Sequence, residues 1–219
     1  MAIAYDNSTY FAGSAVSSVT ESHTVAGTDR ILFVYFYWDT SRTVSSVTYG
    51  GVAMTAVGTQ NDNNGGEFSN TYYLVAPATG ANDVVVTMSG TCGIEGVASS
   101  YTGALQVSPI DATRYEPHNL ETGTAYAEAL TATADNCWVV WGTREYEGRT
   151  ITAGSDTALR AWSPSVFGAI LADSNAAVVS AGSRTLNLNA SASGNWYSDV
   201  LVSFKPSASV NTTNFFAMM

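Results

Sequence analysis

The sequence predicts an all-β protein, an antiparallel β-sandwich of two packed sheets. Ser, Thr and Gly are abundant, whereas Lys, Leu and Glu, which fill the exposed faces of helices, are scarce. Short apolar or alternating runs recur roughly every ten residues with turn residues between them, a spacing typical of sandwiches and barrels. With 219 residues, the chain is long enough to bury a core of its own.

The first half of the chain contains runs rich in β-branched and aromatic residues, separated by turn residues. The predicted strands cover residues 30–38, 44–49, 52–57, 71–76, 83–88 and 96–101. Gly50 and Gly51 predict a tight hairpin, because both central positions of a type I′ turn need a positive φ. Residues 77–80 predict a turn that begins with proline, and residues 61–66 predict a longer hairpin loop.

The second half contains a further set of such runs. The predicted strands cover residues 126–131, 136–143, 157–162, 166–172, 184–188 and 196–204. In the last of them Trp196, Val200, Val202 and Phe204 share one parity, so one face of that strand is expected to meet the core and the other to be mixed. No repeat of fixed period stands out along the chain.

Domain boundaries follow from the segments that lack apolar alternation. Residues 108–125 predict a long crossover loop between two halves of one sandwich, because the runs on either side are too few for two independent cores. We therefore predict an N-terminal arm at 1–20, a single sandwich domain at 21–206 and a C-terminal extension at 207–219. The extension is polar and small as far as residue 214 and then turns apolar.

The composition of the chain disfavours two classes of binding partner. The formal net charge is -10, with one lysine, Lys205, among eight basic residues. Binding to nucleic acid or to an anionic membrane surface is disfavoured, because both need clustered Lys and Arg. The first ten residues lack the pattern of a secretory signal, and the longest apolar run, 31–38, is too short to span a membrane. We expect synthesis in the cytosol.

The sequence offers few groups for chemistry. Cys92 and Cys137 lack metal or redox spacing, and two buried reduced thiols are expected, with a single disulfide as the alternative. His23 and His118 are the only imidazoles, and no nucleophile motif accompanies them, so both are interpreted as structural. The 61–67 loop carries oxygen ligands but fails the EF-hand pattern. We predict no catalytic residue, metal or cofactor.

Carboxylates and aromatic rings leave two sugar-related alternatives open. Glu145 and Glu147 lie two residues apart at a strand end, where they would share a face as glycosidase carboxylates do, although a charged strand end is the simpler interpretation. Trp38 and Trp162 also lie at strand ends and are the candidates for stacking on a glycan. The competing interpretation is that each indole caps the core with its N–H directed outward.

Several stretches of the sequence together resemble those of a known protein family. They are residues 47–52 (VTYGGV), 73–80 (YLVAPATG) continuing into 83–88 (DVVVTM), and 98–103 (ASSYTG) followed by Pro109, Ile110 and Asp111. The chain resembles jelly-roll-like β-sandwich domains found in virion proteins of tailed bacteriophages and in some bacterial surface proteins, over roughly residues 20 to 205. These motifs are turn and core residues, so the resemblance implies a fold more directly than an activity.

The resemblance implies a non-enzymatic virion protein, a capsid decoration (cement) protein or a small fibre component, assembled in the host cytoplasm. Its expected partners are the major capsid protein, other virion proteins and copies of itself. The N-terminal arm and the apolar end of the chain are expected to make these contacts, the latter through Phe215, Phe216, Met218 and Met219. The alternatives are a glycan- or receptor-binding module of a tail fibre or surface protein and, third, a polysaccharide-active enzyme.

Overall fold

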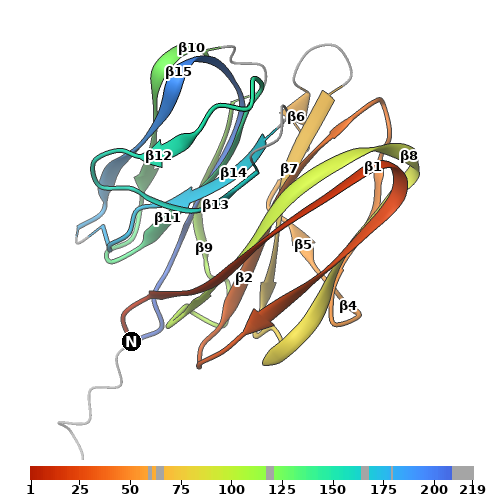
Figure 1. Cartoon of the computed structure of the whole chain (residues 1–219). Helices are drawn as coiled ribbons and strands as arrows, with labels where there is room; N and C mark the ends of the chain where they lie inside the picture. Colours follow the sequence, from red (N-terminus) through yellow and green to blue (C-terminus); the bar gives the residue numbers. More distant parts are fainter. Residues whose placement is uncertain (59–60, 63–66, 117–120, 164–167, 179, 209–219) are drawn as a thin grey trace, which may run out of the picture.

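The computed structural model describes residues 1–58, 61–62, 67–116, 121–163, 168–178 and 180–208. It confirms the predicted fold class: the described residues form two antiparallel sheets and no helix (Figure 1). The first sheet contains β1 (Ala4–Val25), β2 (Ile31–Asp39), β3 (Val44–Tyr49), β4 (Val52–Ala53), β5 (Thr55–Ala56), β6 (Asn61–Asp62), β7 (Glu67–Val75) and β8 (Gly80–Thr102). The second contains β9 (Ile110–Glu116), β10 (Glu121–Ala132), β11 (Trp138–Glu145), β12 (Ile151–Ala153), β13 (Ala158–Trp162), β14 (Gly168–Asp173) and β15 (Gly182–Phe204).

The first sheet curls around a core of its own because its longest strands bend together. β1 follows β8 along its whole length, and the pairing register shifts near Ala15, whose φ is +54°. The early part of β8 also pairs with β3, whereas its late part pairs with β2. The side chains of Leu32, Val34 and Phe36 on β2 point into this first core.

The opposite face of β2 builds the central core between the two sheets. Ile31, Phe33 and Tyr35 alternate with the residues of the first core and pack against the second sheet, including Val202 and Phe204 of β15. This explains why β2 is an uninterrupted apolar run: both of its faces are covered. The second sheet curls in the same manner around a third core, into which Trp141 and Trp196 project.

The two sheets have equivalent topologies, with β1, β2, β7 and β8 corresponding to β9 with β10, β11, β14 and β15. The correspondence extends to single residues. Asp6 and Asp111 each lie where the register of the first strand slips by one residue. The hydroxyl of Ser100 donates to the Asp6 carboxylate at 2.7 Å, and that of Ser203 donates to Asp111 at 2.9 Å. The chain therefore contains a structural repeat that is not visible as a sequence period.

Several predicted elements change length in the structure. The predicted strands 83–88 and 96–101 are parts of β8, and 184–188 and 196–204 are parts of β15, because each strand continues through its bend while pairing with one long partner segment. The predicted crossover loop at 108–125 is wrong, since it contains β9 and the start of β10. Of residues 1–20, predicted as an arm, all from Ala4 onward belong to the single strand β1, which continues to Val25. Gly50 and Gly51 both have the positive φ that the predicted hairpin requires.

Gly142 on β11 lies against Tyr35 on β2 and gives a first test of the central core. A Cβ atom there would lie 2.2 Å from Cδ2 of Tyr35, a fully buried ring. We expect Gly142→Ala to lower the free energy of unfolding by about 2 kcal/mol, because the ring has no room to move aside. Urea unfolding followed by circular dichroism measures the change. Gly182→Ala is the control, because its nearest neighbour is the Ser180 carbonyl oxygen at 3.8 Å; equal effects would contradict the packing argument.

Candidate functional site

His23 belongs to a buried hydrogen-bond network and not to a catalytic triad. Its Nδ1 lies 2.9 Å from the Thr9 hydroxyl and its Nε2 lies 3.2 Å from the Ser100 hydroxyl. The Asp6 carboxylate accepts the Ser100 hydroxyl proton, so the acid orients the serine and not the imidazole. Burial lowers the pKa of His23 to about 4. This network connects both ends of β1 to β8; the other histidine, His118, lies outside the described residues.

The carboxylates of Glu145 and Glu147 have separate local roles. Glu145 is buried, and its two oxygens accept the backbone N–H groups of Glu147 and Arg149 at 3.0 and 2.8 Å. Glu147 lies at the surface, where it pairs with the Arg149 guanidinium at 2.7 Å and accepts from the Asn195 side-chain amide at 3.0 Å. Glu145 thus shapes the turn after β11, and Glu147 contributes to a surface network.

The two tryptophans proposed for glycan stacking differ in burial. Trp38 is fully buried, its ring stacks on Phe68, and its N–H donates to the Arg42 carbonyl at 2.9 Å. The Trp38 ring is therefore not accessible for stacking on a glycan, because β2 is covered on both faces as far as its end. Trp162 at the end of β13 is only half-buried and packs against the third core.

The two cysteines are free and buried, which confirms that the thiols are not paired with each other. Burial raises the pKa of Cys137 to about 11 and also raises that of Cys92, so neither thiol is activated at neutral pH. Among the described residues, no group of three or more His, Cys, Asp or Glu is arranged to hold a metal ion. The predicted hairpin loop at 61–66 lies largely outside those residues.

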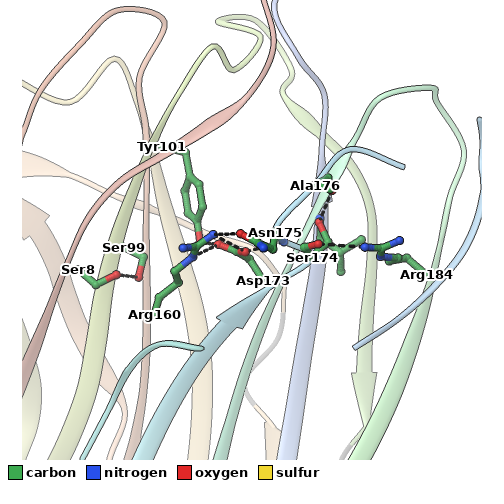
Figure 2. A network of polar contacts seen from close by, with 10 residues as sticks. Ser8, Ser99, Tyr101, Arg160, Asp173, Ser174, Asn175, Ala176 and Arg184 are labelled. Carbon is green, nitrogen blue, oxygen red and sulfur yellow. Dashed lines mark hydrogen bonds and ion pairs between the residues drawn. The ribbon is translucent and has the colours of Figure 1, made fainter. Parts of the chain in front are cut away.

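A charged cluster that sequence analysis missed joins the two sheets (Figure 2). The buried Asp173 carboxylate accepts the Tyr101 hydroxyl at 2.9 Å from across the central core, and it forms a two-pronged ion pair with Arg160 at 2.5 and 2.9 Å. The Arg160 guanidinium lies over the Tyr5 ring, 4.1 Å from its centroid. Burial and the neighbouring Asp173 raise the pKa of Tyr101 well above its ordinary value. The cluster fastens the two sheets together.

An apolar pocket of about 610 Å³ opens at the end of the central core. It is bordered by four segments of the sequence, which are the residues before β1, the start of β11, the connection after β14 and the residues after β15. The lining residues are Met1, Ala2, Ile3, Asn136, Trp138, Ala176, Ala177, Pro206, Ser207 and Ala208. No single segment contains more than a few of the lining residues, so the pocket could not be predicted from the sequence.

The wall of the pocket is held in place by hydrogen bonds. The Ser174 hydroxyl donates to the Ala176 carbonyl at 2.7 Å and accepts the Val139 N–H at 3.2 Å. The Arg184 guanidinium donates to the Ser174 carbonyl at 3.0 Å (Figure 2). This wall continues directly from Asp173, so the pocket is built on the same rigid framework that joins the sheets. Such a preformed apolar concavity is a typical binding feature.

Further exposed apolar side chains lie near the pocket. Met1, on its rim, is 58% exposed. Val107 is 77% exposed and follows Leu105, whose N–H donates to the Lys205 carbonyl, next to the pocket residue Pro206. The predicted contact residues Phe215, Phe216, Met218 and Met219 lie outside the described part of the chain, which ends at the pocket with Ala208. We call the pocket together with Met1 and Val107 the apolar end.

Comparison with protein-family models, with curated proteins and with solved structures finds no match to this chain. In its described residues, no helix has the length and apolar character needed to cross a membrane.

Proposed function

We propose that the protein is a non-enzymatic structural protein of a bacteriophage virion, most simply a capsid decoration protein. The observation that carries the proposal is the apolar end, where a preformed pocket and two exposed apolar side chains occur together. Rigid apolar surface rimmed by polar groups is typical of protein docking sites. In this role the protein binds across neighbouring subunits of the major capsid protein through the apolar end.

The charge and the sequence motifs support the same role. A net charge of -10 favours solubility at high copy number. The turn and core motifs resemble those of tailed-phage virion domains. A decoration protein stabilises a shell because its binding free energy adds to that of the assembled state, and symmetry repeats each modest contact many times.

The test combines localisation with a variant of the pocket. Immunogold electron microscopy with an antibody to this chain is expected to label the capsid facets of virions from the source lysate. Ala176→Arg, which places a charge at the pocket rim, is expected to reduce co-sedimentation with undecorated capsids at least tenfold. Val52→Arg is the matched control, because Val52 is 55% exposed on β4 and does not line the pocket.

Other outcomes would overturn parts of this proposal. Label at the tail tip would favour the alternative role in glycan or receptor recognition, for which Trp162 is the remaining aromatic candidate. A glycan screen with Trp162→Ala would then measure its contribution. No label on any particle would contradict a virion role, and equal binding by the two arginine variants would contradict docking through the pocket.

A further inference from the structure

A pair of reciprocal hydrogen bonds joins the two halves of the chain at one end of the central core. Beyond β8, the N–H of Leu105 donates to the Lys205 carbonyl at 2.9 Å. Beyond β15, the N–H of Ser207 donates to the Gly103 carbonyl at 2.7 Å. In both bonds the donor is the third residue after its own strand, and the acceptor is the first residue after the other strand. The two bonds are therefore equivalent under exchange of the halves.

The residues between these bonds lie on a local two-fold axis. Ala104 and Pro206 form an antiparallel bridge, and each is the second residue after its strand, β8 or β15. An antiparallel pair of equivalent residues is related by a rotation of half a turn. The axis of that rotation passes between Ala104 and Pro206.

Contacts between the two sheets follow the same symmetry. β1 of the first sheet meets β13 of the second, where the Arg160 guanidinium lies over the Tyr5 ring. β5 and β13 are counterparts, because they pair with β7 and β14 at the last position of each sheet. The reverse contact is also present: Gly58, just after β5, touches Tyr115 of β9, the counterpart of β1, so closely that no Cβ atom would fit. Reciprocal contacts of this kind define the two-fold interfaces of homodimers.

The local two-fold axis passes through the apolar end. Pro206, which lies beside the axis, lines the pocket. On one side of the axis, the segment after β8 carries the exposed Val107. On the other side, Ala176 and Ala177 of the second half contribute to the pocket wall. The surface proposed to dock therefore has two flanks, one from each half of the chain.

This arrangement fits a partner with the same symmetry. Two identical subunits related by a two-fold axis present the same surface from opposite sides, so each can contact one flank of the apolar end. Copies of one protein that assemble into a closed shell meet at such axes. A single chain whose internal symmetry is two-fold cannot repeat its contacts around a three-fold centre.

We infer that the partner at the apolar end is a pair of identical subunits related by a two-fold axis, and that one chain binds on that axis. The inference rests on the proposed function and deepens it, because it specifies which arrangement of capsid subunits the protein recognises. Each flank of the apolar end contacts one subunit, and no second copy of this chain is needed to complete the contact.

The position of the full-length chain on capsids tests the inference. The chain is added in excess to undecorated capsids and located by electron cryo-microscopy. We expect its density on strict or local two-fold axes of the shell, with at most about one bound chain per two capsid subunits. Density on three-fold axes, or away from any axis, would overturn the inference and leave docking to the capsid intact. No binding at all would overturn the proposed function and this inference with it.

A variant on each flank gives a second measurement. Val107→Arg is expected to reduce co-sedimentation with undecorated capsids roughly tenfold or more, as Ala176→Arg does on the other flank, because each flank contacts its own subunit. Val52→Arg, at an exposed position outside the pocket, is again the matched control. If Val107→Arg bound as well as the control while Ala176→Arg remained impaired, the pocket would dock alone. That result would overturn the two-fold arrangement and not the capsid role.

Discussion

Asp173→Asn is expected to lower the free energy of unfolding by about 3 to 5 kcal/mol. The substitution keeps the shape of the side chain but leaves the charge of Arg160, whose side chain is only 14% exposed, without its partner in a buried site. It also weakens the acceptor of the Tyr101 hydroxyl, which is buried with its hydrogen bond in the central core. For a chain of this size the loss corresponds to a fall in Tm of roughly 10 °C.

The matched control is an ion pair between Arg184 and Asp156, in which the acid is exposed. Arg184 and Asp156 lie 3.8 Å apart, and the Asp156 side chain is 71% exposed, so Asp156→Asn is expected to change stability by less than about 0.5 kcal/mol. Thermal and denaturant unfolding of the two variants measure the difference. If Asp173→Asn were as mild as Asp156→Asn, the cluster would not be what fastens the sheets together.

The charged cluster and the pocket were harder to predict from the sequence than the strands were. Strand type follows from local pattern, and β2 and β11 were recognised because β-branched and aromatic residues fill them. Asp173, Arg160 and Tyr101 carry no such signal, because each belongs to a different strand and only the packing of two sheets brings them together. The pocket has the same origin, since its walls come from four separate segments.

The long strands show a second limit of sequence reasoning. A bend in a strand interrupts the alternation of apolar residues, so β8 was predicted as two strands although hydrogen bonding to β1 continues on both sides of the bend. The same bends hide the repeat, because Asp6 and Asp111 align only when pairing registers are compared. The sequence left two interpretations of Trp38 open, because the burial of a side chain at a strand end depends on the elements that pack over it.

Acid is expected to destabilise the protein mainly through His23. Burial lowers the pKa of His23 from its ordinary value of 6.5 to about 4 in the folded state, and only the nearby Asp6 opposes this. Protonation therefore favours the unfolded chain. The contribution of His23 to stability is complete above pH 6.5 and is lost as the pH falls to about 4, a total of about 3 kcal/mol.

Protonation of Asp111 is expected to extend the loss of folding stability to lower pH. Partial burial disfavours its charged form, yet hydrogen bonds from Thr133 and Ser203 hold the pKa of Asp111 below its ordinary value. A carboxyl group of this kind stabilises the fold above its unfolded-state pKa, and this contribution disappears as the pH falls through the folded-state value. Between pH 6.5 and 4 the dependence of the unfolding free energy on pH is thus expected to come from His23, and below that range from Asp111 as well.

Denaturant unfolding at a series of pH values separates these contributions. We expect His23→Gln to cost about 1 to 3 kcal/mol at pH 7.5, because an amide replaces the ring only imperfectly between Thr9 and Ser100, and to flatten the slope between pH 6.5 and 4. His118→Gln, at the only other histidine, is expected to leave that slope unchanged. A steep slope that persisted in His23→Gln would mean that other groups cause it and that His23 contributes little to the pH dependence of folding, which would contradict the lowered pKa expected from the burial of His23.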